Sequence, residues 1–551
     1  MPDSRQLTSD DVQPQSGQLA GSSGRLVVWS VCLLALAMVV ALSSEAVRAA
    51  VREQGFFILP PLIGFAFAVV TIRALRSQWS AGSRACPGLN RWKLAQRRAF
   101  LPVLLLIPIA VQVLLICFVR TQPASDWASY WQSAGRLLSD GEYVCELGNG
   151  QEFRARKPPG MAVYLALIRA TFGESVIAAQ CANALLILAG NVLFYLVVRR
   201  RFGQPTAACA TALYALWPSR ILSAALLSYD APGSLAVLIL WWLADHRGRC
   251  RSAAMAGAGI AAGLAAMFRQ PLLLLPVALL LSRLMVREDR RRLIKDALLG
   301  LMGLALILGP WTYRNYRVLG TPVMTSTIGG PSLYRSFHPQ AGRYYTNVGW
   351  EELVVESGGD EIKLSKLGYR RGLEFIARDP LAAAVRVLRN WHRLFESDHE
   401  IAGLVFDTPG GSFSPRVYRI ARAAACGASD VWYAWLALTT LLAAGIVLRR
   451  RSPPKRLQAS GYRLQALSPK PGARSPEPNL FWPLLAVATA VVVHGVFESQ
   501  PRYFVMYQCF WALLAASILQ ASLKRTEGGE TRRCRLFSPG HARDPADNQL
   551  D

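Results

Sequence analysis

The sequence has no Cys-x-x-Cys pair, although it contains ten cysteines. Structural metal clusters usually need cysteines or histidines at short, paired spacing. Most of these cysteines lie in apolar segments, where a thiol behaves as a small apolar side chain. The sequence therefore predicts no metal cluster.

Acidic residues are also scarce, because 35 Asp and Glu stand against 61 Lys and Arg and give a formal net charge of +26. In a soluble protein this excess would suggest nucleic-acid binding. However, no segment resembles a nucleic-acid-binding motif, and most basic residues fall in short loops and tails. The positive-inside rule produces this distribution in membrane proteins, so nucleic acid is not expected as a partner.

Long apolar runs make up much of the chain, of which 52% is hydrophobic, and polar residues cluster between them. This pattern predicts an all-α polytopic membrane protein with about twelve transmembrane helices. A balanced segment after the middle of the chain predicts a small, mainly helical extracytoplasmic insertion, in which 361–378 and 381–396 have helical spacing of apolar residues. No internal repeat is detected.

The predicted organisation follows the alternation of apolar runs and basic loops. Its regions are a disordered cytoplasmic tail (1–24), two extra N-terminal transmembrane helices with a basic loop (25–98), a transmembrane core (99–319) with a first extracytoplasmic loop (120–175), an extracytoplasmic loop domain (320–430), C-terminal transmembrane helices (431–521) with a cytoplasmic linker (449–478), and a cytoplasmic tail (522–551). The first region has no basic stretch beside an apolar core, so a cleaved signal peptide is not expected.

The loop at 73–98 fixes the predicted orientation, because it is rich in Arg and Lys and has no acid. It should be cytoplasmic, so the run at 99–119 leads outward to the loop at 120–175. The apolar piece 158–171 is shorter than the roughly 20 residues that a span needs, and we expect it to be interfacial or re-entrant. Cys145 and Cys426 should then lie on the oxidising side of the membrane, where they either form a disulfide or stay as free thiols.

The segment from Ser125 to Gly173 is a polar stretch rich in charged and aromatic residues, set among apolar runs. Asp126 closely follows the run ending at Val119, so its carboxylate should sit at a membrane surface, where a fixed charge acts strongly. Lys157-Pro158-Pro159-Gly160 ends the polar stretch, since proline has no backbone donor. An acid, a base and a membrane boundary therefore share one loop.

This loop resembles the first extracytoplasmic loop of the GT-C class of membrane glycosyltransferases, in the family of protein O-mannosyltransferases and bacterial lipid A aminoarabinose transferases. The resemblance rests on the order of an acid, a Tyr-Ala-Leu-Gly pattern, Lys-Pro-Pro-Gly and Phe-Gly. The residues that carry it are Asp126, Tyr130, Ala134, Leu137, Gly141, Lys157 to Gly160, Phe172 and Gly173. Pro310-Trp311-x-x-Arg314-Asn315 and Arg502-Tyr503 are also similar to family signatures, and Asp230 matches a family acid that opens a membrane helix.

The resemblance implies a glycosyltransferase that uses a polyprenyl-phosphate-linked sugar. Asp126 and Asp230 are the predicted catalytic acids, with Asp126 as the general base that deprotonates an acceptor. The donor phosphate needs cations at the membrane surface. The predicted donor- and substrate-binding residues are Arg156, Lys157, Arg269, Arg314, Arg502 and Tyr503.

Each role has a simpler alternative. Asp126 could cap a helix over 127–138, Asp230 could be an ordinary helix-start acid, and the arginines could anchor to lipid headgroups. No metal or other cofactor is assigned, because no second acid adjoins Asp126, although some relatives use divalent ions. A lone histidine such as His494 on an apolar helix is more often hydrogen-bonded in a core.

The predicted function is therefore inverting transfer of a hexosyl or pentosyl group to a lipid, cell-wall glycan or protein acceptor. The predicted site faces the extracytoplasmic side of a bacterial inner membrane, and membrane lipids are further expected partners. The alternative is a polyprenyl-lipid or glycolipid transporter or flippase without transferase activity, which should show repeats and charges in the middle of long spans. Neither is found in the sequence.

Overall fold

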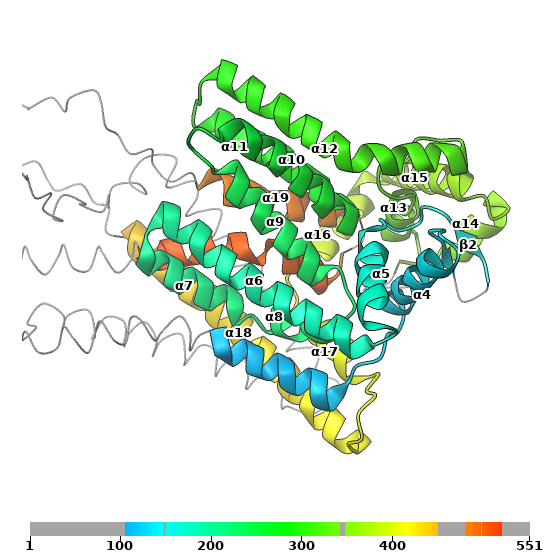
Figure 1. Ribbon diagram of the computed structural model, residues 1–551, viewed down its shortest axis with the longest axis horizontal. Coiled ribbons are helices and arrows are strands. Elements are labelled where there is room, and N and C mark those ends of the chain that lie inside the picture. The colour runs from blue at the N-terminus through cyan, green and yellow to red at the C-terminus, as the bar shows by residue number, and fades with distance from the viewer. Residues whose placement is uncertain (1–104, 147–149, 342–347, 450–479, 498, 521–551) are drawn as a thin grey trace, which may run out of the picture.

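The structure is a computed structural model that describes residues 105–146, 150–341, 348–449, 480–497 and 499–520. The predicted N-terminal tail, the two extra N-terminal helices with their basic loop, most of the linker at 449–478, and the C-terminal tail lie outside the described residues. Figure 1 shows a bundle of roughly parallel helices with a group of shorter helices at one end.

Apolar helices form the bundle. By length and composition, four helices within the described residues can cross a membrane. They are α6 (Val176–Phe202), α10 (Arg251–Phe268), α12 (Arg290–Leu319) and the helix Arg502–Gln520, which includes part of η6 (Pro501–Tyr507). Shorter apolar helices are Leu105–Val119, ending in the π-helix η3 (Leu115–Val119), α5 (Gly160–Phe172), α9 (Asp230–Ala244), Gln270–Met285, made of η5 (Gln270–Leu274) and α11 (Leu275–Met285), and α19 (Phe481–Val496). α5 covers most of the apolar piece 158–171, and the interfacial or re-entrant position of that piece stays a prediction.

Glycines allow α10 and α12 to pack closely. A Cβ on Gly259 would lie 1.9 Å from the carbonyl oxygen of Gly300, and one on Gly303 would lie 2.0 Å from that of Ala256. Small residues at such contacts let helix backbones approach each other in a membrane, where packing replaces the hydrophobic effect as the driving force. The largest core cluster lies deeper in the bundle, around the buried Trp217 and Trp511.

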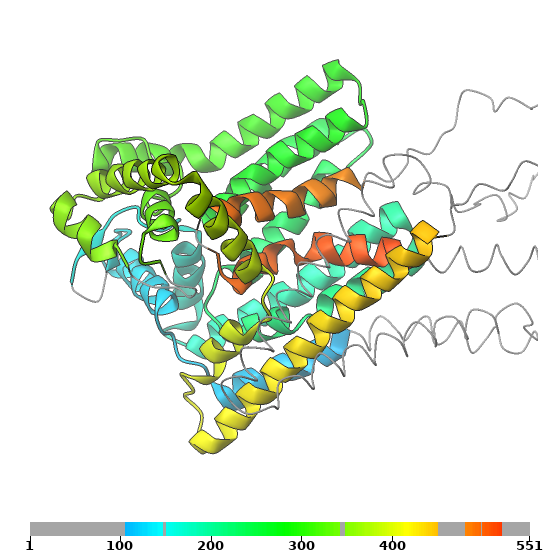
Figure 2. The ribbon, with the colours of Figure 1, turned by 180° about the vertical axis from the view of Figure 1, so that it is seen from behind.

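Two apolar runs of the sequence do not coincide with single helices. The apolar run at 206–226 is broken into α7 (Gln204–Ala215), α8 (Pro218–Leu222) and η4 (Ser223–Ala225), because Pro218 has no N–H to continue α7 and starts α8 instead. The run expected from 431 belongs to α18 (Pro415–Arg449), which begins earlier than the apolar run. Its first turns contain arginines, so hydrophobicity does not mark them as part of the helix. Figure 2 shows α18 along the outside of the bundle, beside the helix 105–119.

The shorter helices gather at one end of the bundle (Figures 1 and 2). They are α4 (Asp126–Ser139), α13 (Gly329–Phe337), α14 (Trp350–Ser357), α15 (Glu361–Arg378), α16 (Pro380–Leu394) and α17 (His399–Phe406). The two helices expected at 361–378 and 381–396 are confirmed, and the break between them is stabilised by Asp379, whose carboxylate accepts from the N–H of Ala382.

A small hairpin, which the sequence did not predict, joins this end. Its strands are β1 (Cys145–Glu146) and β2 (Glu152–Phe153), which pair antiparallel. Cys145 and Cys426 are both free thiols, so the disulfide considered from the sequence does not form in this structure. The sulfur of Cys145 instead lies 3.0 Å from the hydroxyl of Ser129.

Candidate active site

A cavity of about 340 Å³ lies where α4, the loop before α5, the end of α10, η5, α13 and α19 meet η6. Its volume is within the range of small-molecule pockets. Six of the eight residues predicted from the sequence line it, although they come from distant parts of the chain. They are Asp126, Arg156, Lys157, Arg269, Arg502 and Tyr503.

Asp126 is the first residue of α4, and the residue before it is strained. Ser125 has φ 52° and ψ −125°, a left-handed region that a non-glycine residue rarely adopts. Ser125 is the N-cap, and no side chain caps this helix. The interpretation of Asp126 as a mere helix cap is therefore wrong, because its carboxylate turns to other partners.

Two cations that lie far apart in the sequence bind the Asp126 carboxylate, one at each oxygen. The ammonium of Lys157 donates to Oδ1 at 2.8 Å, and the guanidinium of Arg502 donates to Oδ2 at 3.3 Å. Both cations are almost buried, at 9% and 10% side-chain exposure, whereas the carboxylate is 39% exposed. An acid is thus presented to the cavity by two fixed positive charges.

Burial alone would raise the pKa of the Asp126 carboxyl, but Lys157 and then Arg502 outweigh it and hold this pKa well below its usual range. Asp126 is therefore ionised at any physiological pH. A carboxylate held this way is a weak base until a competing anion takes over one of its cations.

The Lys-Pro-Pro-Gly sequence places Lys157 against the end of α10. A Cβ on Gly160 would lie 2.6 Å from the carbonyl oxygen of Met267, so only glycine permits this approach. The carbonyl of Lys157 also accepts from the hydroxyl of Tyr143 at 2.9 Å, and its ammonium lies 4.5 Å from the centre of the Tyr130 ring. The motif therefore brings Lys157 beside Arg269, which follows α10.

Arg269 is held by aromatic rings rather than by an acid. Its guanidinium carbon lies 3.6 Å from the centre of the Tyr503 ring, and Nη1 donates to the Tyr229 hydroxyl at 2.8 Å. Its Nε has no hydrogen-bond partner within the described residues. Arg269 is 7% exposed. Arg269 is thus a buried cation on a cavity wall, and no ion pair within the described residues neutralises it, so it is suited to bind an anion.

Arg156 and Arg335 add positive charge on the side of the shorter helices. The guanidinium of Arg156 lies 4.6 Å from the centre of the Trp350 ring. Arg335 projects from α13, is 8% exposed and also lines the cavity, as does His494 of α19. Arg335 was not predicted from the sequence, because the segment around it has balanced charge and no distinctive motif.

Two predicted residues lie outside the cavity lining. Asp230 opens α9 and is 2% exposed, and its Oδ2 accepts from the hydroxyl of Ser228 at 2.7 Å. Arg314 donates to the backbone carbonyls of Arg154 at 2.6 Å and Tyr143 at 3.0 Å. Arg314 thus holds the backbone of the first loop in place, rather than reaching the cavity itself.

Glu361, which was not predicted as a site residue, supports the same loop. Its carboxylate accepts from the N–H groups of Arg154 and Ala155 and from the hydroxyl of Thr327, at 2.7, 3.0 and 2.6 Å. Glu361 begins α15, so the shorter helices fix the strand that leads into Arg156 and Lys157. A single buried acid at a helix start gives no signal in the sequence.

Across the described residues, no group of three or more His, Cys, Asp or Glu side chains is arranged to hold a metal ion. The charges that converge on the cavity are mainly positive, which suits an anion rather than a cation.

Residues 156–313 match the family model described as dolichyl-phosphate-mannose-protein mannosyltransferase. The chain is also 26% identical over 242 residues to undecaprenyl phosphate-alpha-4-amino-4-deoxy-L-arabinose arabinosyl transferase 2 of Pseudomonas fluorescens. That match covers 43% of this chain and 40% of the relative, so the chain matches less than half of the relative's length.

Among solved structures, the chain is similar to ArnT from Cupriavidus metallidurans bound to undecaprenyl phosphate, with 17% identity, a TM-score of 0.35 and coverage of 79% of this chain and 80% of that one. It is also similar to the oligosaccharyltransferase of Archaeoglobus fulgidus, with 13% identity, a TM-score of 0.42 and coverage of 79% and 51%.

The matched segment begins at Arg156, continues through Lys-Pro-Pro-Gly and ends at Tyr313, just before Arg314. Together with the helices that can cross a membrane, it identifies an integral membrane protein. The resemblance to the GT-C family of protein O-mannosyltransferases and aminoarabinose transferases, first seen in the sequence, is confirmed.

Proposed function

We propose that this chain is a membrane glycosyltransferase that moves a sugar from a polyprenyl-phosphate carrier to an acceptor. The observation that carries the proposal is the convergence of Asp126, Lys157, Arg269 and Arg502 on one cavity. The cavity offers an acid, cations and aromatic walls, as transfer from a lipid-linked sugar phosphate requires. The transporter alternative has no comparable observation in its favour.

The donor phosphate is proposed to bind Arg269, with Lys157 and Arg502 as its neighbours. Arg269 has no acid partner within the described part of the chain, and its planar guanidinium can bind two phosphate oxygens at once. As the bond between sugar and phosphate breaks, the leaving phosphate gains negative charge. A fixed cation stabilises that state more than the ground state and so accelerates the reaction.

Asp126 is proposed to accept the proton of the acceptor hydroxyl or amine as that group attacks the anomeric carbon. In the empty cavity its carboxylate shares Lys157 and Arg502. A bound phosphate competes for these two cations, so the negative charge near Asp126 rises and its pKa moves upward towards a useful range for a base. Attack opposite the leaving phosphate inverts the anomeric carbon.

The sugar is proposed to be a hexose or pentose, and the similarity to an arabinosyl transferase of Pseudomonas fluorescens supports the pentose. The acceptor is proposed to be a lipid, a cell-wall glycan or a protein. Mass spectrometry of glycans and lipids from cells with the gene, without it and with Asp126→Asn tests the proposal. One sugar modification should disappear in the last two strains, and an unchanged profile in both would contradict the proposal.

We also propose that the cavity faces the extracytoplasmic side of a bacterial inner membrane, in a chain of about twelve spans with a small helical insertion. Arginines at the opposite ends of the helices support this orientation, since positive residues favour the cytoplasmic side. They include Arg199, Arg200, Arg201, Arg249, Arg290, Arg291 and Arg292.

Single cysteines in an otherwise cysteine-free chain test the orientation. Ser139 is exposed at the cavity end and Cys250 is exposed at the opposite end. A membrane-impermeant thiol reagent added to intact cells should label Ser139→Cys and spare a chain that keeps only Cys250. The reverse pattern would invert the orientation.

A further inference from the structure

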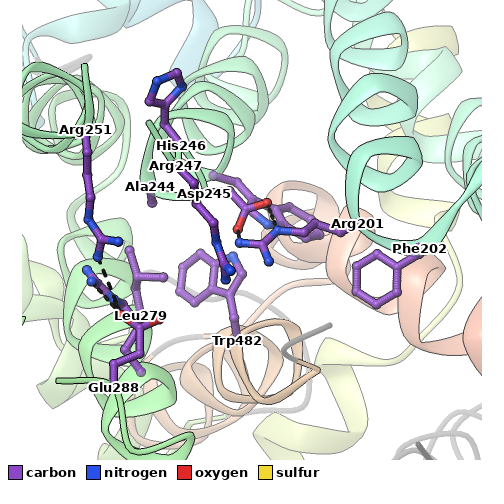
Figure 3. A pocket seen from close by; sticks show the side chains of 12 residues that line it. Arg201, Phe202, Ala244, Asp245, His246, Arg247, Arg251, Leu279, Glu288 and Trp482 are labelled. Carbon is purple, nitrogen blue, oxygen red and sulfur yellow. Dashed lines mark hydrogen bonds and ion pairs between the residues drawn. The ribbon is translucent and has the colours of Figure 1, made fainter. Parts of the chain in front are cut away.

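A second, smaller pocket lies at the other end of the bundle (Figure 3). Its volume is about 50 Å³, which is enough for a few water-sized groups but too small for a sugar ring with its phosphate. The pocket is formed by the ends of α6, α9, α11 and the beginnings of α10 and α19. Four of its lining residues are arginines, namely Arg201, Arg247, Arg251 and Arg283.

Two helices connect this pocket with the large cavity. α10 begins at Arg251 in the small pocket and reaches the large cavity at Phe268, after 18 residues. At 1.5 Å per residue this is about 27 Å, close to the roughly 30 Å thickness of the hydrocarbon core. α19 likewise runs from Trp482 in the pocket to Val493 in the cavity. The small pocket therefore lies at the depth of the headgroups in the opposite leaflet.

Three of the four arginines are neutralised by acids. Arg201 binds both carboxylate oxygens of Asp245, as the dashed lines in Figure 3 mark. Arg283 donates to Glu288 at 2.8 Å and to Asp296 at 2.6 Å. Arg251 also donates to Asp296, through Nε at 3.0 Å. These pairs tie the helix ends together and build the pocket walls.

Arg247 is different. It makes no hydrogen bond or ion pair within the described part of the chain, and its side chain extends towards Trp482 between the paired groups (Figure 3). The four arginines of the pocket face three acids, Asp245, Glu288 and the buried Asp296, so one positive charge is left over. That charge lies beside aromatic walls on an exposed loop, where a ligand can reach it.

We propose that this pocket binds a phosphate group, with Arg247 as the cation that holds it. The volume suits one phosphate, Arg247 supplies a positive charge that the acids of the pocket leave over, and Trp241 and Trp482 offer contact to an apolar attachment. Basic pockets between membrane helices are a recurrent way to bind anionic lipid headgroups. The phosphate comes either from an anionic phospholipid of that leaflet or from solution, and the two sources share the same recognition chemistry.

The test uses the full chain in nanodiscs of phosphatidylcholine, with and without phosphatidylglycerol. Native mass spectrometry should detect retained phosphatidylglycerol, and the anionic lipid should raise the thermal unfolding temperature. Arg247→Gln should weaken retention about fivefold, which is the effect of one arginine near a headgroup. Arg247→Lys should weaken it less. Arg249→Gln, which removes a neighbouring arginine outside the pocket lining, is the matched control and should retain the lipid normally.

Inorganic phosphate, added to nanodiscs of phosphatidylcholine alone, separates the two sources. If it raises the unfolding temperature of the wild-type chain but not of Arg247→Gln, the pocket takes phosphate from solution. If only phosphatidylglycerol does so, the pocket takes a headgroup. Equal responses of the wild type and Arg247→Gln, or an equal loss in Arg249→Gln, would overturn the proposal.

Discussion

The two polar cavities of this protein use the same kinds of side chain in opposite ways. In the large cavity, Arg269 lies on aromatic rings and two cations share one acid, Asp126. In the small pocket, three arginines form ion pairs with acids, whereas Arg247 has no ion-pair partner within the described residues. A cation neutralised by a neighbouring acid holds helices together, whereas a cation held by neutral groups keeps its charge for a ligand.

The strongest way to break this comparison is to remove the acid of the large cavity. Asp126→Asn preserves the shape of the side chain but removes the proposed base, so sugar transfer should fall by about 10²–10⁴-fold. Transfer is measured in single turnovers with saturating lipid donor.

Asp140→Asn is the matched control, since it makes the same change at the other end of α4. Asp140 is exposed, pairs with the exposed Arg136 and accepts a hydrogen bond from the Ser139 side chain, so transfer should stay near normal. If Asp126→Asn keeps more than about a tenth of the normal rate, Asp126 is not the base.

Arg269→Ala should have the next largest effect. Removing the cation that faces the leaving phosphate should lower the single-turnover rate about 10²–10³-fold, the loss typical of one preorganised donor. Arg269→Lys should recover only part of it, because the bidentate geometry is lost. A normal rate in folded Arg269→Ala would assign the phosphate to Lys157 and Arg502 instead.

Asp245→Asn tests whether the ion pairs of the small pocket stabilise the fold. It leaves Arg201 without its partner in a site where both side chains are less than one-fifth exposed, at 17% and 18%. We expect a loss of stability of about 2–4 kcal/mol, seen as a lower thermal unfolding temperature in nanodiscs. The exposed pair of Asp140 and Arg136 should contribute less than about 1 kcal/mol. Similar losses for both pairs would refute the structural role of the buried one.

Asp398 extends the comparison to a buried acid outside both cavities, whose hydrogen-bond partners are uncharged. It accepts from the N–H of Ser219 and the hydroxyl of Tyr433, each at 2.9 Å. Burial raises the pKa of its carboxyl to about 6. The folded chain then keeps a proton that the unfolded chain releases near pH 4, so its stability should fall as pH rises from about 4 to about 6.

The expected size of this effect is about 1–3 kcal/mol. The thermal unfolding temperatures of the wild type and Asp398→Asn, compared between pH 4 and 7, measure it. The wild type should lose stability relative to the variant across that interval and run parallel to it above pH 7. A constant difference at every pH would contradict the raised pKa of Asp398.

The sequence predicted the residues of the large cavity better than their arrangement. Lys-Pro-Pro-Gly and Arg502-Tyr503 are local motifs, so they could be read directly from the chain. The contact of Asp126 with Arg502 joins residues far apart in sequence, and only the fold creates it. Arg314 illustrates the limit, because a family motif does not reveal that the guanidinium faces backbone carbonyls rather than the cavity.

Helix boundaries failed where charge or proline interrupted the apolar pattern. The start of α18 carries arginines, and the apolar run at 206–226 contains Pro218, so hydrophobicity alone does not give the helix boundaries in either segment. The helices α15 and α16 were predicted correctly because Asp379-Pro380 is a local signal that ends one helix and caps the next.

The most direct test of the account measures the donor itself. The purified full-length chain in nanodiscs is supplied with a total lipid extract from its source cells, and free polyprenyl phosphate is followed by mass spectrometry. The wild type and Asp140→Asn should release polyprenyl phosphate at similar rates, whereas Asp126→Asn should release it at least about 10²-fold more slowly. Equal release by Asp126→Asn, or none by the wild type, would contradict transfer of a sugar from a polyprenyl phosphate at this cavity.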